Sequence, residues 1–537
     1  MLAQIKYFVN SLNKTRVGLV FWASSGVFFL IVLQNTGVLP LGASDFFFFA
    51  LVALGLAMYR PSWAFLFFIS VITIENVNLA PENIGIMVRP YQLLGALVIL
   101  AVIARLASKK LGFKLAKITL WDYLVIAIAV SGFLSAAFSS SKGASFKLSI
   151  ILASFAALYF LVRNYVQDRT DLGRIAPFFL SSVLIVSAYG IWQNIRNILG
   201  QSSFEVMPGR PNATFPEPDW LGMFLVFALA AVYALMYFYE RRSAEESLDD
   251  PLSRIGKILL YVFLIPIFIL LFIAVSRSAW LGAAAVTVVF LCVSFIRVMR
   301  KEWNFWEFAK MKIGIVSMAV IALAFVFIFH LTSFQLFNRA TSTSSGLQKI
   351  TVACETQSEF DSLKNPIENI SQLENTGCEH IDLEDIESEK SRGFSVGEIS
   401  RKDPTSNIRA EIYKKSWQEI KKSPVFGIGW GSIGQVLGKD ENGATLNSSN
   451  IFLEIWLGSG IIGILSFVAV FGYILFGGLR CFFQEKGNAD QAIGIFLTAS
   501  WFAIVIPNLF NAGILMAYVW VWLGISVSLI ENRTYNR

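Results

Sequence analysis

Residues 409–434 read RAEIYKKSWQEIKKSPVFGIGWGSIG, which is a charged helical segment followed by a Ser-Pro break and a glycine-rich turn. They belong to residues 334–450, the only long water-compatible stretch in a chain that otherwise consists of apolar runs. Asn450 then opens the next apolar run. The sequence therefore predicts a membrane-embedded scaffold with one large water-exposed loop.

The composition supports this division. The 537-residue chain is 55% hydrophobic and 15% charged, whereas soluble domains have about 25% charged residues. Apolar runs of about 20 residues, the length that a helix needs to cross the hydrocarbon core, recur along the chain. We predict an all-α polytopic integral membrane protein with about 12–14 transmembrane helices and one large extracytoplasmic loop that carries a helical cap. The predicted spans are residues 17–34, 44–59, 61–76, 90–107, 119–138, 148–166, 175–193, 220–239, 258–275, 279–296, 313–331, 450–479, 490–506 and 509–529.

The net charge of +7 reflects Lys and Arg in alternate short connections rather than on one face, so the pattern argues against a nucleic-acid partner. The positive-inside rule then predicts a multi-pass membrane protein with both termini cytoplasmic and the large loop outside. The opposite orientation would place Lys109 to Lys117 outside and is disfavoured. The first apolar run, residues 17–33, is expected to remain as an uncleaved helix.

Three regions follow from this count: residues 1–331 with about eleven transmembrane helices, residues 332–448 as the loop, and residues 449–537 with about three helices and a cytoplasmic tail. Within the loop, residues 407–434 are predicted to form a helix and a glycine-rich turn. Residues 341–400 form an acidic insertion with few aliphatic side chains, which we expect to be solvated and partly flexible rather than a metal site. Cys354 and Cys378 lie in this insertion and could pair in an oxidising compartment, although the sequence alone does not decide it.

Two short outer connections carry an arginine that is a candidate site residue. Arg277 lies between two apolar runs so close together that they form a hairpin, and it either faces the bundle interior or extends to the lipid headgroups. Arg210 lies in a proline-rich connection with Glu217 and Asp219. This connection either lines a cavity or is a rigid connector whose carboxylates favour the start of the next helix.

The end of the large loop supplies further candidates. Arg409, Tyr413, Trp417 and Ile420 share one predicted helix face that would pack on the bundle, unless the helix is an ordinary cap with Arg409 at its surface. The alternating glycines after residue 426 predict either an anion-binding nest or a close-packed turn. Glu454 lies about one turn inside the following span. Three arginines from separate outer segments suit a lipid-linked phosphate or pyrophosphate.

Together these residues resemble the O-antigen ligase and O-antigen polymerase superfamily of bacterial envelope glycosyltransferases. The resemblance covers roughly residues 200–530. Its marks, in chain order, are Gly209-Arg210 with Thr214-Phe215 and Pro218, Ser276-Arg277-Ser278-Ala279-Trp280-Leu281, a large loop with Arg409, Trp417, Pro424 and Gly427-Ile428-Gly429, then Asn450-Ile451-Phe452-Leu453-Glu454 and Gly460 to Gly463.

The resemblance implies a metal-independent enzyme without cofactors that transfers a glycan from undecaprenyl pyrophosphate to a hydroxyl of a glycan or lipid acceptor at the outer membrane face. Its partners would be the lipid-linked oligosaccharide donor, the acceptor and membrane lipids, and arginines would stabilise the leaving pyrophosphate. The expected catalytic residues are Arg277, Arg409, Asn450, Asp219 and Glu454. The expected substrate-binding residues are Arg210, Glu217, Ser276, Trp417, Gly427, Gly429 and Ser449.

The sequence departs from the family at one position, because Ser449 stands where the family has a histidine before Asn450. A serine hydroxyl is a poor general base, so Asp219, Glu217, Glu454 or His330 could take the proton, and a polymerase or a divergent ligase is favoured slightly over a typical ligase. The alternatives are a transporter or flippase of lipid-linked saccharides and a non-catalytic envelope scaffold. The candidates lie on one membrane face, and no paired broken helices are evident in repeated halves, which argues against a transporter.

Overall fold

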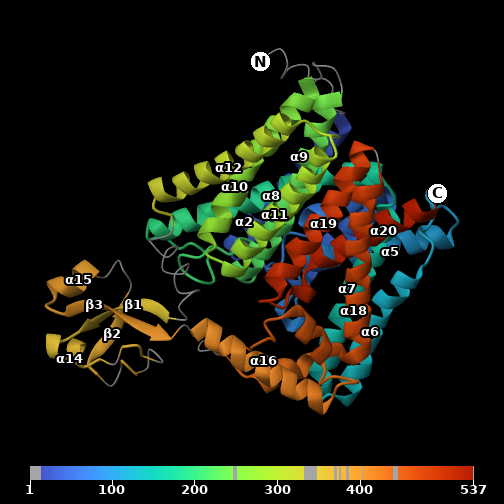
Figure 1. The fold of residues 1–537 in the computed structure, drawn as a ribbon. Coiled ribbons are helices and arrows are strands. Elements are labelled where there is room, and N and C mark those ends of the chain that lie inside the picture. The colour runs from blue at the N-terminus through green and yellow to red at the C-terminus, as the bar shows by residue number, and fades with distance from the viewer. Residues whose placement is uncertain are drawn as a thin grey trace.

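The computed structural model describes residues 14–245, 251–331, 347–363, 365–367, 372–373, 376–381, 386–402, 404–439, 445–485 and 487–535. Within them the chain is a helical bundle with a small sheet module beside it (Figure 1). Among the described residues, eleven helices are long and apolar enough to span a membrane, which confirms the predicted all-α polytopic class. The bundle helices are α2 Lys14–Asn35, α3 Ala43–Tyr59, α4 Pro61–Val71, α5 Pro90–Ala107, α6 Leu120–Phe138, α7 Lys142–Tyr165, α8 Arg169–Ile198, α9 Pro218–Glu245, α10 Pro251–Ile273, α11 Arg277–Met299, α12 Phe305–Ile328, α18 Ile451–Gln484, α19 Asn488–Asn508 and α20 Ala517–Tyr535.

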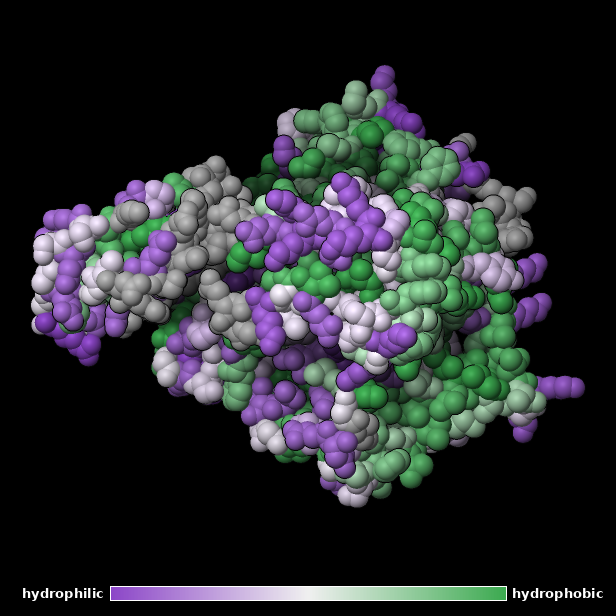
Figure 2. All heavy atoms as spheres, turned by 90° about the horizontal axis from the view of Figure 1, so that it is seen from below, coloured by the Kyte–Doolittle hydropathy of each residue, from purple (hydrophilic) through white to green (hydrophobic). Residues whose placement is uncertain are grey.

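Helix α20 lies at the centre of the bundle. Every residue from 517 to 530 is buried, including Tyr518, Trp520 and Trp522, as expected for a helix that is apolar on all sides. Peripheral helices instead expose large apolar side chains, such as Phe28 on α2 and Val320 on α12. Figure 2 shows hydrophobic residues over the flank of the bundle, while hydrophilic residues gather on the face turned to the viewer and on the protruding module.

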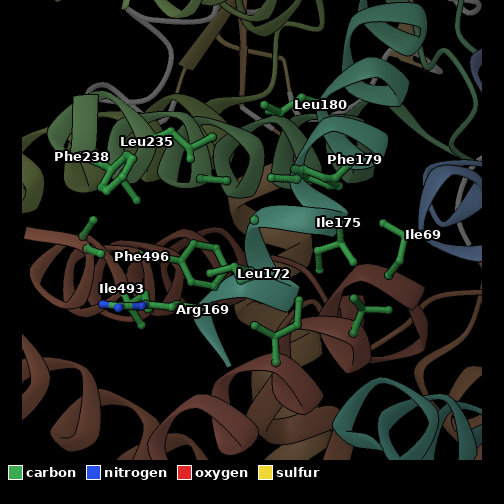
Figure 3. A pocket seen from close by; sticks show the side chains of 18 of the residues that line it. Ile69, Arg169, Leu172, Ile175, Phe179, Leu180, Leu235, Phe238, Ile493 and Phe496 are labelled. Atoms are coloured by element: carbon green, nitrogen blue, oxygen red, sulfur yellow. The ribbon is translucent and has the colours of Figure 1, made fainter. Parts of the chain in front are cut away.

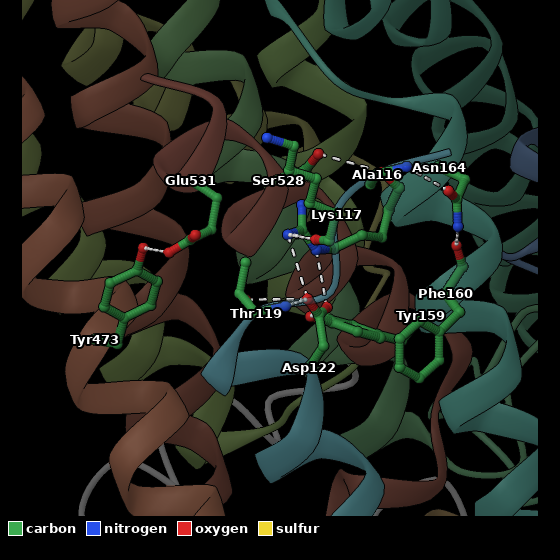
Figure 4. A network of polar contacts seen from close by, with 11 residues as sticks. Ala116, Lys117, Thr119, Asp122, Tyr159, Phe160, Asn164, Tyr473, Ser528 and Glu531 are labelled. Atoms are coloured by element: carbon green, nitrogen blue, oxygen red, sulfur yellow. Dashed lines mark hydrogen bonds and ion pairs between the residues drawn. The ribbon is translucent and has the colours of Figure 1, made fainter. Parts of the chain in front are cut away.

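A buried ion pair joins α6 and α7 at one end of the bundle (Figure 4). Arg163 Nε donates to Asp122 Oδ1 at 2.9 Å, and the Tyr159 hydroxyl donates to the same oxygen at 2.7 Å. Both charged side chains are 2–3% exposed, so the charges require these partners. Ser528 of α20 donates to the Arg163 carbonyl oxygen, which ties the central helix to the same end.

Helix α18 breaks at Gly460, where φ is +64° and ψ is −165°. The glycine-rich turn of the loop packs against this break and satisfies its backbone: the amides of Ile428 and Gly429 donate to Leu457 O at 2.7 and 3.1 Å, and the amide of Ile461 donates to Val425 O at 3.1 Å. A β-carbon at Gly427 or Gly460 would overlap the opposing carbonyl oxygens. The turn is thus close-packed, and these amide groups are used inside the fold rather than offered as an anion nest.

The rest of the loop consists of the cap helix α16 Pro404–Lys422, the short helices η4 Trp430–Ser432 and α17 Ile433–Leu437, and the sheet module. The module is an antiparallel sheet in the order β2-β1-β3, formed by β1 Leu347–Cys354, β2 Cys378–Ile381 and β3 Ser395–Lys402, with helices α14 Gln357–Ser362 and α15 Ile386–Ser391. Cys354 and Cys378 are directly opposite in the register and form a disulfide.

The module corrects the expectation of a solvated, partly flexible insertion. It has its own small core, made of Ile350, Val352, Cys354, Ile367, Leu373, Cys378 and Ile399. Sparse aliphatic side chains suffice because the disulfide lies inside that core and reduces the apolar area the module needs. Asp382, Glu384 and Asp385, at the centre of the acidic run, lie outside the described residues.

Two predicted spans include long irregular segments in the structure. Helix α4 has 11 residues, about 16 Å of helix, which is too short to cross a bilayer, and the chain continues as an irregular connection. Residues 509–529 were predicted as one span, but α20 begins at Ala517 and residues 509–516 form a buried connection with a 3-10 turn, η5 Gly513–Leu515. Hydropathy misses this connection because its residues are as apolar as the helices around it.

Gly460→Ala is expected to lower the free energy of unfolding by about 1–3 kcal/mol, because the left-handed backbone disfavours a β-carbon and the methyl group would overlap Val425 O. Thermal unfolding of the purified protein in detergent measures this. Gly472→Ala, in the same helix where a β-carbon meets nothing, is the matched control and should be neutral or slightly stabilising. Equal melting temperatures for the two variants would contradict this account of the break.

Replacing Cys354 and Cys378 together with serine is expected to destabilise the sheet module by about 3 kcal/mol, since the bridge closes a loop over a sequence separation of 24. Hydrogen exchange in the full-length protein should rise in residues 347–402 and stay unchanged in α9 and α19. Unchanged exchange in the module would show that its core is sufficient without the bridge.

Candidate functional site

The connection between α19 and α20 joins the cap helix, the start of α18 and the start of α11. Leu509 O accepts hydrogen bonds from the Tyr413 hydroxyl at 2.8 Å and from Asn450 Nδ2 at 3.2 Å. The Arg409 guanidinium carbon lies 5.8 Å from the centre of the Phe510 ring. Asn511 Nδ2 donates to Ser278 Oγ at 2.9 Å. Three consecutive residues thus bring Arg409, Asn450 and the Arg277 turn to one end of the bundle.

Arg210 reaches the same end from the proline-rich connection and is buried. Its Nε donates to Ala274 O at 3.2 Å, its Nη2 donates to Val275 O at 3.4 Å, and Nη2 lies 3.5 Å from Asp219 Oδ1. These carbonyls directly precede Ser276 and Arg277. Arg210 therefore positions the turn that carries Arg277 and forms an ion pair with the first turn of α9.

Val275 shows why such support is needed. Its φ is +49°, a left-handed conformation that a β-branched side chain adopts only under constraint. The hydrogen bond from Arg210 to its carbonyl oxygen supplies part of that constraint. Positive φ values also occur at Ala213, in the connection that carries Arg210, and at Ser449, just before Asn450. Strain of this kind concentrates at functional sites.

Arg277 is the first residue of α11 and is half-buried. Ser276, the residue before the helix, is fully buried, and its Oγ lies 3.2 Å from Ser278 Oγ. The start of a long helix has a partial positive charge from its unpaired N–H groups. A guanidinium group at this position adds to it, so the start of α11 is electropositive and favours an anion.

The inward face of α16 differs from the predicted stripe. Ile412, Ser416 and Ile420 are buried, whereas Arg409 and Tyr413 lie half-buried at the edge of this face. Trp417 is 46% exposed and packs edge to face on Trp456 at 5.8 Å between ring centres. Trp417 therefore does not lie on the inward face of α16. Burial raises the pKa of the Tyr413 hydroxyl, with Arg409 opposing the shift, so the phenol stays protonated at neutral pH and donates its hydrogen bond.

Asn450, Ser449 and Glu454 organise the start of α18. Asn450 Oδ1 caps the helix by accepting from the amides of Phe452 and Leu453 at 2.9 and 3.2 Å. Ser449 has φ +50°, and its carbonyl oxygen accepts from the Tyr413 hydroxyl at 3.1 Å. Glu454 Oε2 accepts from the Ser448 amide at 2.7 Å. The side chains of Asn450 and Glu454 and the backbone of Ser449 thus fix the path of the chain beside Arg409.

The remaining candidates for the proton acceptor lie in different surroundings. Asp219 is partly exposed and paired with Arg210, while Glu217 is exposed two residues earlier. His330 is exposed after the end of α12, and His380 is exposed on β2 of the sheet module. Because His330 does not point into the bundle, it is excluded as the proton acceptor.

Four residues near this end of the bundle were not predicted from the sequence. Phe510 and Asn511 were placed in a transmembrane helix because of their apolar surroundings. Glu205 lies five residues before Arg210 and accepts from the Gly209 amide at 2.9 Å and Ser203 Oγ at 3.1 Å. Its Oε1 is buried and has no hydrogen-bond partner among the described residues, and burial raises its pKa. The sequence signal was an acidic residue close before Gly209-Arg210.

The fourth is Glu75, in the connection after α4, whose side chain is 1% exposed. It accepts from the Tyr91 hydroxyl at 2.7 Å and from the Ala517 amide at 2.8 Å, and lies 3.4 Å from Arg89 Nε. Burial raises its pKa, and Arg89 opposes the shift. The amide of Glu75 also donates to Thr214 O at 2.9 Å. Glu75 thereby joins the Arg210 connection to the start of α20.

The site is therefore a set of arginine-bearing connections held together at one end of a polytopic membrane bundle. Within the described parts of the chain, no three His, Cys, Asp or Glu side chains group as metal ligands.

Residues 259–468 match the model of the O-antigen ligase family. The match runs from α10 into α18, contains Arg277, Arg409, Asn450 and Glu454, and confirms the predicted relationship to the O-antigen ligase and polymerase superfamily. This family indicates glycan transfer of the ligase or polymerase type by a multi-pass membrane protein. The match begins after Arg210 and Asp219. No curated protein and no solved structure is significantly similar to the chain.

Tyr413→Phe is expected to loosen α16, because the variant loses the hydroxyl that donates to Leu509 O and Ser449 O, a loss of about 1 kcal/mol. Hydrogen exchange of α16 should accelerate about fivefold while exchange of α9 stays constant. Tyr123→Phe, which alters an exposed ring on α6, is the control. Identical exchange in the two variants would mean that the hydroxyl does not anchor the cap.

Proposed function

We propose that the protein transfers a glycan from undecaprenyl pyrophosphate to an acceptor hydroxyl at the outer face of the bacterial cytoplasmic membrane. The observation that carries this proposal is the meeting of the Arg277 and Arg409 segments on residues 509–511. Arginine forks match the oxygen geometry of phosphate groups. The family match supports the reaction class.

In this reaction the acceptor oxygen forms a bond to the anomeric carbon of the glycan, and the bond from that carbon to the pyrophosphate oxygen breaks. The electron pair leaves with undecaprenyl pyrophosphate. Arg277, Arg409 and the electropositive start of α11 would stabilise the negative charge on this leaving group. Arg210 would act as a positioning residue, because its donors are engaged with the turn before Arg277. Asn450 and Trp417 would shape the acceptor side.

The acceptor proton needs a base other than the family histidine, since residue 449 is serine. We assign the role to a carboxylate that flanks Arg210, with Asp219 and Glu205 as the two choices. The raised pKa of Glu205 brings its carboxyl closer to the pH at which a general base is most effective. Asp219 is more exposed and therefore more accessible to an acceptor. Glu454 does not belong to this pair, because it lies at the start of α18, where its carboxylate accepts from the Ser448 amide.

The orientation of the protein in the membrane is part of the proposal. A disulfide in the sheet module favours an oxidising compartment for the large loop. The opposite end of the bundle carries the basic residues Arg16, Lys117, Arg163, Arg169 and Arg297, as the positive-inside rule requires of the cytoplasmic side. The replacement of the family histidine by Ser449 favours a polymerase or a divergent ligase.

The decisive experiment supplies the purified protein with labelled undecaprenyl-pyrophosphate oligosaccharide and envelope acceptors. Wild type should release the lipid pyrophosphate and lengthen or transfer the glycan. Arg277→Ala and Arg409→Ala should each lower the rate by about 100-fold, the loss typical of removing one charge-stabilising donor. The transfer rates of Glu205→Gln and Asp219→Asn are then measured across pH. The variant that lacks the base should lose the pH-dependent limb of its rate profile.

Arg392→Ala, an exposed arginine of the sheet module paired with Glu389, is the control and should keep full activity. Full turnover by both the Arg277 and Arg409 variants would exclude this site assignment. Movement of intact lipid-linked sugar across a vesicle bilayer, without a new glycosidic bond, would favour a transporter instead.

A further inference from the structure

A cavity of about 490 Å³ lies between α4, α8, α9, α19 and α20 (Figure 3). Its volume falls in the range of about 300–1,000 Å³ that is usual for ligand pockets. The wall is aliphatic and aromatic apart from Arg169, Thr170 and Gly173. None of the predicted site residues lines it. The cavity is therefore separate from the candidate glycan-transfer site.

The lining residues differ in exposure between the two ends of the cavity. Ile72 and Val521 at the buried end are 2% and 3% exposed, whereas Arg169, Thr170 and Gly173 at its opening, the first turn of α8, are exposed. Helix α8 runs from this opening to Ile198, just before the connection that carries Arg210. The opening therefore faces the end of the bundle opposite to Arg277 and Arg409.

Two guanidinium groups flank the opening. Arg169 has a 61% exposed side chain, and its Nη1 lies 3.9 Å from Asp490 Oδ2. This long ion pair involves only one edge of the Arg169 guanidinium group, which has five N–H donors. Arg16, at the start of α2, donates to the carbonyl oxygen of Gly173. An apolar chamber with cationic groups at its mouth matches a molecule with an apolar tail and an anionic head.

We propose that this cavity binds one acyl chain of an anionic phospholipid, whose phosphate contacts Arg169 and Arg16 at the opening. The chamber lies among spanning helices, where burial of an apolar chain against an apolar wall is favourable and water is scarce. Arginine near a membrane surface attracts anionic headgroups. The polyprenyl tail of a glycan donor is a poorer match, because a donor whose pyrophosphate lies beside Arg277 would enter from the other end.

The test uses the delipidated full-length protein, incubated with vesicles of equal amounts of phosphatidylglycerol and phosphatidylcholine with identical acyl chains. Native mass spectrometry counts the lipids retained. Wild type should retain one lipid, with about a fivefold preference for phosphatidylglycerol. Arg169→Ala should keep the lipid but show a smaller preference, because Arg16 remains. Ala176→Trp, which fills the cavity, and Gly173→Phe, which blocks its mouth, should each lose retention.

Arg174→Ala and Leu184→Trp are controls on the same helix, outside the cavity, and should behave as wild type. Gly173 has open space around it, so its variant carries the test if Ala176→Trp does not fold. Wild-type retention by a folded cavity variant, or an unchanged preference in Arg169→Ala, would overturn the proposal. So would displacement of phosphatidylglycerol by undecaprenyl phosphate at equal concentration, which would assign the cavity to the donor tail.

Discussion

The structure depends on one constraint, which is that backbone N–H and C=O groups away from water must find partners inside the protein. Helix α18 breaks at Gly460 and would leave such groups unpaired. The loop residues Val425, Ile428 and Gly429 complete the break with three hydrogen bonds. The water-exposed loop and the membrane bundle are therefore one folding unit, and the position of the cap helix is fixed by the backbone requirements of a helix that follows it in sequence.

The connection between α19 and α20 meets the same constraint with side chains. Asn508 Oδ1 accepts from the Gly513 amide at 2.8 Å, and Trp520 Nε1 donates to Ile514 O at 2.7 Å. The neighbouring Leu509 carbonyl and Asn511 amide group bind the cap, α18 and α11. The polar groups that make a buried irregular connection possible are thus continuous with those that frame the candidate site. Strain at Val275 and the support from Arg210 extend this frame to the turn before Arg277.

The fold class was predictable because hydropathy over long runs is a strong signal, and the helical cap was predictable from its charged helical segment. The glycines after the Ser-Pro break left two alternatives open, an anion nest or a close-packed turn. The site was predictable only as separate pieces. Arg277, Arg409 and Asn450 carried recognisable local patterns, but nothing in the sequence related them to Phe510 and Asn511, which look like membrane helix. Likewise, the alternating glycines and Gly460 were each visible, yet their contact is a long-range packing relation that periodicity cannot reveal. The sheet module was missed because a disulfide-linked core needs few aliphatic residues.

The two hydrogen bonds that the Leu509 carbonyl oxygen accepts determine where this chain tolerates a change in length. Tyr413 and Asn450 both bind one carbonyl oxygen, so the chain between them closes a ring that passes through the glycine-rich turn. Adding or removing residues inside this ring would move Arg409 relative to α18. The sheet module is inserted before α16, outside the ring. A change in the length of the module therefore leaves the ring between Tyr413 and Asn450 unchanged, because the module joins the chain before Tyr413.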